Sequence, residues 1–384
     1  MRLGKELKRI LIFVDWYEPG FKGGGPIRSI VNFVQNMHSY YDLYIFTSDR
    51  DLGDARPYQN IDVDVWINKE NASIFYASPK FLNWTGISKQ IKTVHPDFIY
   101  LNGMYALHYA IYPLLMKRFG ITDSKVILAP RGMLQKGALQ FKTKKKKLFL
   151  KLISWLNIPF IITGHSTDEQ EKMDIQKYLP GIKEVYKLPN FSSAVPPEPV
   201  KIVKQKNILN CIFISRISPK KNILFFISLL KKIPPHIKLT ISIRGNIEAA
   251  DYWQLCEDVI TQLPANVIVM YGGAIDNKEV LNVLAQHHIF VLPTLGENFG
   301  HAIFEALSIG RPVLISDQTP WKNLTQAKAG WDLPLREEEF VNVINEVAEM
   351  DDETFQQWCQ GAWQLANNYI ATSDIKKAYL KLFS

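Results

Sequence analysis

Short apolar runs recur along this chain, and each is followed by a loop and a stretch long enough for a helix. Such runs, rich in β-branched and aromatic residues, predict buried strands, and strands that alternate with helices predict a parallel sheet. The expected strands are 10–14, 41–47, 73–76, 98–101, 126–129, 160–163, 211–215, 239–243, 267–270 and 289–292. The predicted fold class is therefore α/β.

The strand pattern stops at a proline-rich segment, residues 192–201, and restarts beyond it. A single core is not expected for 384 residues, because cores stop growing at roughly 250–300 residues. The sequence therefore predicts two Rossmann-like domains, residues 1–195 and 196–365, followed by a terminal helical segment at 366–384.

Composition narrows the class of protein. Hydrophobic residues make up 47% of the chain and charged residues 21%, which argues against a disordered or membrane-embedded protein. Three separated cysteines without a Cys-x-x-Cys pair imply neither disulfides nor zinc, so a reducing cytoplasm is expected. The apolar run 10–14 meets Asp15 too soon for a signal peptide. The longer run 148–163 is interrupted by polar residues, short of the ~20 that a spanning helix needs.

The stretch 290–321 carries the most chemical information, because it reads as strand, loop, helix and strand. Gly296 and Gly300 let the loop backbone approach a ligand, and the helix that starts near Gly300 points unpaired N–H groups, which favour anions, into the same space. Glu297 lies on the loop and Glu305 within the helix. Two solvated acids are the alternative, but this edge of a parallel sheet is where α/β folds bind ligands.

Arg216 and Lys221 flank the strand-to-helix turn that follows the strand 211–215. This spacing places two cations at the same edge of the sheet, beside another helix start. Either could also be an ordinary surface residue.

The order Arg216, Lys221, Glu297, Glu305, with Gly-Glu-Asn-Phe-Gly-His and Glu-Ala-Leu around the two acids, resembles the donor-binding motif of the family-4 retaining glycosyltransferases. The resemblance covers nearly the whole chain and is strongest from 209 to 335. It implies the GT-B fold, in which two Rossmann-like domains have parallel sheets facing across a cleft, and a terminal helix that packs back on the first domain.

The resemblance also implies roles for individual residues. Glu305 would bind the ribose of the nucleotide, Glu297 would lie on the sugar side as a catalytic residue, and Arg216 and Lys221 would neutralise the diphosphate. Backbone amides of Asn298, Phe299 and Gly300 would contact sugar hydroxyls. The second domain would thus bind the nucleotide sugar and the first the acceptor.

Four features of the first domain are further candidates. The loop with Gly23, Gly24 and Gly25, followed by Arg28, is either a mobile turn or, by resemblance, part of the cleft near the acceptor. Asn102 stands where many relatives carry a catalytic histidine, and it can still hydrogen-bond a sugar hydroxyl. Arg131 is either an anion-binding group of the cleft, which the resemblance favours, or a structural donor. His165 is read as structural rather than functional.

Six lysines lie between Lys142 and Lys151, beside apolar residues that include Phe149 and Trp155. A solvated helix with one buried face is the plain reading, but a basic and apolar segment also suits an anionic membrane surface. No recognition module accompanies the charge, so nucleic acid is not an expected partner. The expected location is cytoplasmic, peripheral on the cytoplasmic face of the membrane.

The combined expectation is a retaining glycosyltransferase that moves a sugar from a nucleotide-diphosphate sugar to a polysaccharide, lipopolysaccharide or lipid-linked acceptor. Fixed positive charge is expected to stabilise the leaving group, with no metal and no cofactor. Two alternatives stay open: a nucleotide-sugar epimerase of the same fold, and a non-catalytic sugar- or nucleic-acid-binding module.

Overall fold

The computed structural model describes residues 6–135, 143–372 and 374–384. The chain divides into two compact units, unit 1 (residues 1–191 and 374–384) and unit 2 (residues 192–373). The sequence predicted that the chain passes from the first domain to the second after residue 195, and leaves the second domain after residue 365. The second boundary lies later because one helix, α12 (Asp352–Thr372), runs unbroken through position 365 and stays with unit 2.

Unit 1 alternates strands and helices in the order that the apolar runs predict. Its strands are β1 (Arg9–Phe13), β2 (Asp42–Ser48), β3 (Trp66–Asn68), β4 (Ser73–Ala77), β5 (Phe98–Asn102), β6 (Lys125–Ala129), β7 (Ile162–Ser166) and β8 (Val185–Lys187). Its helices are α1 (Gly25–Met37), α2 (Trp84–Val94), η1 (Leu107–Ile111), α3 (Tyr112–Arg118), α5 (Thr143–Trp155), η2 (Ile158–Ile161), α6 (Glu169–Tyr178) and α13 (Ile375–Leu382).

These strands form one sheet in the order β3-β4-β2-β1-β5-β6-β7-β8. All pairings are parallel except that of β3 with β4. Alternate residues of each strand enter cores on opposite faces: Ile10 and Ile12 of β1 pack on one side, and Leu11 and Phe13 on the other. Strand order reverses between β1 and β5, which places a topological switch point there.

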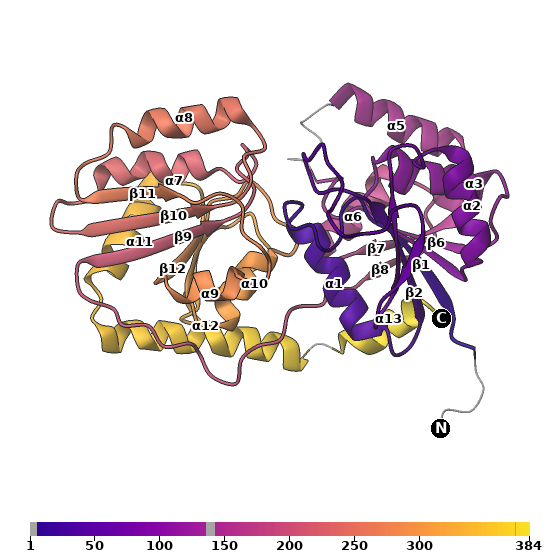
Figure 1. Cartoon of the computed structure of the whole chain (residues 1–384). Coiled ribbons are helices and arrows are strands. Elements are labelled where there is room, and N and C mark those ends of the chain that lie inside the picture. Colours follow the sequence, from indigo (N-terminus) through magenta and orange to yellow (C-terminus); the bar gives the residue numbers. More distant parts are fainter. Residues whose placement is uncertain (1–5, 136–142, 373) are drawn as a thin grey trace. The chain divides into compact units, whose positions relative to one another are not determined.

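The terminal helix α13 completes the core of unit 1 although it is the last element of the chain (Figure 1). Phe383 is fully buried, and its ring lies 5.4 to 5.8 Å from the rings of Tyr41, Phe98 and Tyr100. Tyr379 stacks on Phe191, with ring centroids 4.6 Å apart. Burial of such aromatic side chains is a large apolar contribution to stability.

Unit 2 repeats the same alternation. Its strands are β9 (Ile208–Ile214), β10 (Lys238–Arg244), β11 (Val267–Tyr271), β12 (Ile289–Leu292), β13 (Val313–Ser316) and β14 (Gly330–Leu333). Its helices are α7 (Ile223–Leu229), η3 (Leu230–Lys232), α8 (Ala250–Ile260), α9 (Val280–Ala285), α10 (His301–Ser308), α11 (Glu337–Glu349) and α12.

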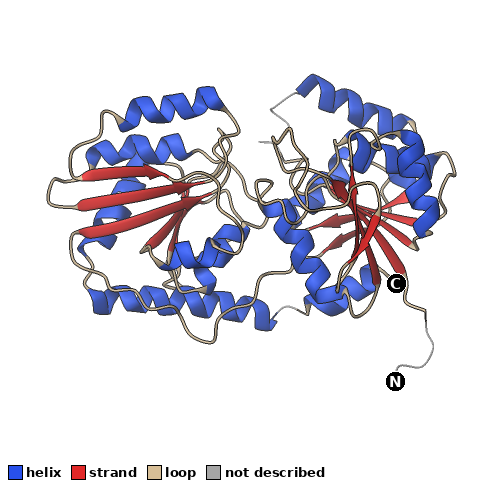
Figure 2. Ribbon diagram, viewed as in Figure 1, coloured by secondary structure: helices blue, strands red, loops and turns tan. Residues whose placement is uncertain are grey.

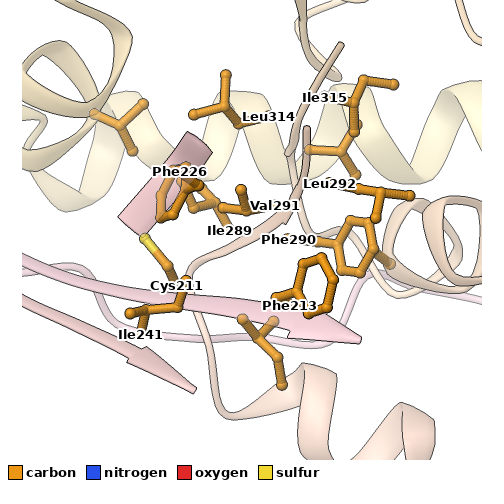
Figure 3. Packing of buried hydrophobic residues seen from close by; sticks show 14 of the residues in the cluster. Cys211, Phe213, Phe226, Ile241, Ile289, Phe290, Val291, Leu292, Leu314 and Ile315 are labelled. Atoms are coloured by element: carbon orange, nitrogen blue, oxygen red, sulfur yellow. The ribbon is translucent and has the colours of Figure 1, made fainter. Parts of the chain in front are cut away.

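The sheet of unit 2 has the order β11-β10-β9-β12-β13-β14, and all its pairings are parallel. Helices α7 and α8 cover one face, and α9, α10 and α12 cover the other (Figure 2). Figure 3 shows the core at the centre of this sheet, where Phe213 and Phe290 come from the neighbouring strands β9 and β12. Strand order reverses between these two strands, which is the switch point of unit 2.

The α/β fold class is confirmed, with one local correction and three additions. The strand expected at 160–163 begins only at Ile162, because Pro159 lies in a short helical turn, η2, that includes Phe160 and Ile161. The short strands β3, β8 and β14 were not predicted, since three or four residues leave too little apolar pattern to read. Among the described residues, no helix has the length and apolar character needed to cross a bilayer.

Candidate functional site

The candidate donor site lies at the switch point of unit 2, where the loops after β9 and β12 join. Leu295 N and Thr294 Oγ1 donate hydrogen bonds of 2.8 and 3.1 Å to the carbonyl of Lys220. Glu297 N donates to the carbonyl of Gln318 after β13. The two loops that carry the predicted residues are therefore tied together by hydrogen bonds from the backbone and from the Thr294 side chain.

Lys221 and Glu297 form an ion pair across these loops. Their side chains are 12% and 13% exposed, so the pair is largely withdrawn from solvent. Sequence reasoning gave the two residues separate roles and did not foresee that they contact each other. The carboxylate of Glu297 holds the ammonium of Lys221 at the edge of the sheet.

Glu305 lies on the first turns of α10 and is 5% exposed. Helix α10 starts after Gly300, whose φ of 78° is left-handed and whose position leaves no room for a β-carbon beside Ile303. Phe299 is buried in the core, and its carbonyl accepts a hydrogen bond of 2.6 Å from Trp321 Nε1. The burial of Phe299 and its hydrogen bond with Trp321 thus fix the Asn298–Gly300 turn, whose backbone lies at the start of α10.

Arg216 follows β9 and donates to Glu248 at 3.0 Å. Its side chain is 35% exposed, and an exposed pair of this kind contributes little to stability. The guanidinium therefore remains able to exchange this carboxylate for another anion. Glu248, in the loop after β10, is a neighbour that the sequence alone did not indicate.

In unit 1 the glycine loop is held by Asp51, which sequence reasoning also missed. Asp51 Oδ2 accepts hydrogen bonds from the backbone N–H groups of Phe21 and Lys22 at 2.7 and 3.0 Å. A β-carbon on Gly20 would collide with the hydroxyl of Tyr58, so a larger residue there would displace this side chain. The predicted loop residues Gly23 and Gly24 lead directly into α1, which starts at Gly25 and carries Arg28 in its first turn.

Arg131 binds other residues of unit 1. Its guanidinium donates to Asn102 Oδ1 at 3.1 and 2.7 Å, to Asn190 Oδ1 at 2.5 Å and to the Tyr100 hydroxyl at 2.6 Å. This is the structural-donor alternative that the sequence left open. Arg131 and Asn102, predicted as separate site residues, therefore act together: the arginine fixes the orientation of the asparagine.

His165 is 1% exposed and lies in the same network. Its Nε2 donates to the carbonyl of Leu188 at 2.9 Å, so Nδ1 accepts from the Tyr100 hydroxyl at 2.8 Å. Burial, assisted by the charge of Arg131, lowers the pKa of His165 to about 3. The neutral imidazole bridges two buried groups, as expected for a structural histidine.

In the described part of the chain, no three His, Cys, Asp or Glu side chains gather as a metal site would require. The three cysteines are buried, and burial raises the pKa of Cys359 to about 12.

Comparisons with known proteins agree with this geometry. Residues 196–359 match the family model described as glycosyl transferases group 1. A 41.2 kDa protein from the cps region of Klebsiella pneumoniae is 24% identical over 182 residues, which are 47% of each chain. The chain thus spans about half the length of that relative.

Two solved structures share the fold of the whole chain. HepE from Anabaena, in complex with UDP and glucose, has a TM-score of 0.67 at 16% identity, with 98% of each chain covered. WaaG, a glycosyltransferase of lipopolysaccharide biosynthesis, has a TM-score of 0.66 at 12% identity, covering 97% of this chain and 98% of its own.

The chain has the GT-B fold of these two structures, so the GT-B fold predicted from the sequence is confirmed. The residues that match the model of the glycosyl transferases group 1 family, 196–359, include Arg216, Lys221, Glu297 and Glu305. The narrower assignment to family 4 stays a prediction.

His165 makes the stability of unit 1 depend on pH. The pKa is about 3 in the folded protein and ~6.5 in an unfolded chain, so between these values the unfolded state binds the extra proton. Its contribution is therefore complete above pH ~6.5 and falls with pH, by at most about 1.4 kcal/mol per pH unit. We predict that His165→Gln, which does not titrate, loses less stability than the wild type between pH 7 and 4 in urea unfolding. Identical losses would show that another group is responsible.

Proposed function

We propose that the chain is a retaining glycosyltransferase, which moves a sugar from a nucleotide-diphosphate sugar to a saccharide or lipid-linked saccharide acceptor. One observation carries the proposal: Arg216, Lys221, Glu297 and Glu305 follow β9 and β12, the two strands that flank the switch point of unit 2. Open α/β sheets bind nucleotides at this position.

The chemistry of these groups suits the donor. Transfer breaks the bond between the sugar and a diphosphate, whose developing charge must be stabilised. Lys221 and Arg216 supply two cations, and the starts of α7 and α10 add backbone N–H groups with partial positive charge. Glu305, buried on α10, can accept hydrogen bonds from the two ribose hydroxyls, and Glu297 beside Lys221 is placed for the sugar.

The relatives suggest which substrates to test first. The Anabaena structure holds UDP and glucose, WaaG is described as acting in lipopolysaccharide biosynthesis, and the Klebsiella relative comes from a cps region. We infer a uridine diphosphate sugar as the donor and a growing surface polysaccharide as the acceptor class.

Binding and product analysis test the proposal together. Thermal shift with a panel of nucleotide sugars identifies the donor, since a ligand at 100 times its Kd adds about 2.7 kcal/mol of stability. The chosen donor is then incubated alone and with saccharide acceptors. A glycosylated product supports transfer, an isomerised donor sugar without acceptor would indicate the epimerase instead, and binding without reaction would indicate a non-catalytic module.

Removal of the Glu305 carboxylate tests the donor site directly. We predict that Glu305→Ala weakens binding of the nucleoside diphosphate by roughly 1.5–3 kcal/mol, the range for hydrogen bonds to a charged group, as measured by isothermal titration calorimetry. Glu346→Ala, an exposed acid on α11 of the same unit, is the matched control and should bind normally. Unchanged affinity in Glu305→Ala would remove this residue from the donor site.

The proposed role of Arg216 and Lys221 leads to a second prediction about the donor site. If Arg216 and Lys221 carry the charge of the leaving group, turnover should persist when a chelator removes divalent ions. Loss of turnover with chelator, restored by Mg²⁺ or Mn²⁺, would show that a metal takes this part.

We also propose that unit 1 docks on anionic membranes through α5. Lys144, Lys145, Lys147 and Lys151 are exposed on this helix, whereas Lys142 lies outside the described residues. Leu148 and Trp155 are 70% and 77% exposed, which is unusual for large apolar side chains. Lysines beside exposed apolar groups are the composition of a membrane-surface helix.

The structure corrects two details of the sequence-based picture of this surface. Phe149 was expected to dock on lipid, but it is half-buried and packs edge-on against Tyr105, with ring centroids 5.3 Å apart. Lys146 turns toward the same ring, with Nζ 5.2 Å from its centroid. We therefore propose Leu148, Leu152 and Trp155, with the four exposed lysines, as the residues that face the lipid.

Vesicle co-sedimentation tests this docking. We predict that replacing Lys144, Lys145, Lys147 and Lys151 with glutamine releases the protein from anionic vesicles, because each well-placed lysine contributes roughly 1 kcal/mol. Binding by the unmodified protein should also weaken with salt, which screens exposed charge over roughly 8 Å at physiological ionic strength.

The matched control replaces four exposed lysines of unit 2, Lys201, Lys206, Lys231 and Lys238, and changes net charge equally. Equal binding by the two variants would attribute the effect to overall charge, and no binding by the unmodified protein would return α5 to a solvated helix.

A further inference from the structure

The switch point of unit 1 holds an acid that has no role in the donor site. Strands β1 and β5 are hydrogen-bonded neighbours, with Phe13 opposite Leu101, and strand order reverses between them. Asp15 lies two residues past the end of β1, and Gly103 one residue past the end of β5. Asp15 therefore occupies the edge of the sheet where α/β units bind ligands.

The carboxylate of Asp15 lies over Gly103. A β-carbon added to Gly103 would come within 3.7 Å of Asp15 Oδ2 and 3.5 Å of Met133 Cε. Gly103 also has a φ of 137°, which side chains rarely adopt. The chain thus keeps a residue without a side chain beside the carboxylate, and Asp15 itself stays partly accessible.

Asn102, next to Gly103, presents a hydrogen-bond donor at the same edge. Its Oδ1 accepts two hydrogen bonds from Arg131, which fixes the orientation of the amide. Nδ2 is buried and, among the described residues, has no hydrogen-bond partner. Asn102 is 7% exposed, and a buried unpartnered donor costs free energy unless a ligand satisfies it.

Asp15 lacks a cationic or side-chain partner among the described residues, although its own backbone N–H stabilises the charged form. None of the ion pairs or side-chain hydrogen bonds between described residues involves its carboxylate, and burial raises its pKa to about 6. Arg50 is paired with Asp49. An unpaired, desolvated carboxylate destabilises the fold, and proteins retain such groups mainly at functional sites.

The two units differ in charge at equivalent positions. Arg216 lies two residues past the end of β9, as Asp15 lies two residues past the end of β1. The cation in unit 2 suits a phosphate, whereas a carboxylate repels one. The ligand of unit 1 is therefore neutral at this point and offers hydrogen-bond donors, as a sugar hydroxyl does.

We propose that Asp15 and Asn102 form a hydroxyl-binding site for the acceptor saccharide. Asp15 accepts a hydrogen bond from one sugar hydroxyl, and Asn102 Nδ2 donates to a neighbouring sugar oxygen. The identity of the ligand as the acceptor rests on the proposed function, whereas the contacts described involve unit 1 alone.

The test measures saccharide and nucleotide binding separately on the full chain. Ligand-detected NMR titrations use glucose, galactose, mannose and N-acetylglucosamine as saccharide probes, with UDP as the second ligand. Asp15→Asn keeps the size of the side chain but replaces the charged acceptor. We expect a roughly tenfold or greater rise in the Kd of the bound saccharide, the loss typical of a hydrogen bond to a charged group, and an unchanged Kd for UDP.

Thermal unfolding separates binding from a structural role. Because Asp15→Asn removes an unpaired buried charge, its Tm should equal or exceed that of the wild type, whereas a structural carboxylate would lower it. Asp42→Asn, the same change at the opposite edge of the sheet, is the control and should leave both ligands unaffected.

Two results would overturn the site: equal saccharide affinity in Asp15→Asn and wild type, or no saccharide bound by a wild type that binds UDP. Failure of the wild type to bind any nucleotide would refute the donor proposal instead.

Discussion

The reversal of strand order within each parallel sheet is the constraint on which the candidate sites depend. At β1/β5 and at β9/β12, neighbouring strands are followed by chain that leaves toward opposite faces of the sheet. No crossover helix covers the strand ends at such a point, so backbone groups and first-loop side chains remain open to a ligand. The topology brings glycines, helix starts and charged residues close together here, so that they can bind the same ligand.

The two units use this shared geometry with opposite charge. Unit 2 places Arg216 and Lys221 at its switch point and balances Lys221 with Glu297, a pair that can be opened by a stronger anion. Unit 1 places Asp15 there without an ion-pair partner among the described residues, and the guanidinium of Arg131 donates to Asn102, Asn190 and Tyr100. The two proposed sites thus use the same type of fold for an anionic ligand in unit 2 and for a neutral hydroxylated ligand in unit 1.

Sequence reasoning recovered what local pattern encodes. Buried strands are apolar runs, so most of them could be placed, and the position of Glu305 on a helix after a strand could be read from spacing. Side-chain partners could not, because the Lys221–Glu297 contact joins residues 76 positions apart, and the orientation of Phe149 depends on Tyr105. From the sequence, Asp15 was only the polar residue that ends an apolar run. Its proposed role depends on Asn102 and Gly103, which the neighbouring strand β5 brings close to it.

The terminal helix α13 packs against the residues that support the proposed site in unit 1. Tyr379 of α13 lies against Phe191 and His165, and His165 contacts Tyr100, which accepts from the same Arg131 that orients Asn102. Unit 1 therefore lacks part of the core beneath its switch point until the last residues of the chain are present. Because α13 follows unit 2 in sequence, synthesis must pass through the whole of unit 2 before unit 1 can reach its final packing. The residues proposed to bind the acceptor thus depend on α13, which follows unit 2 in sequence.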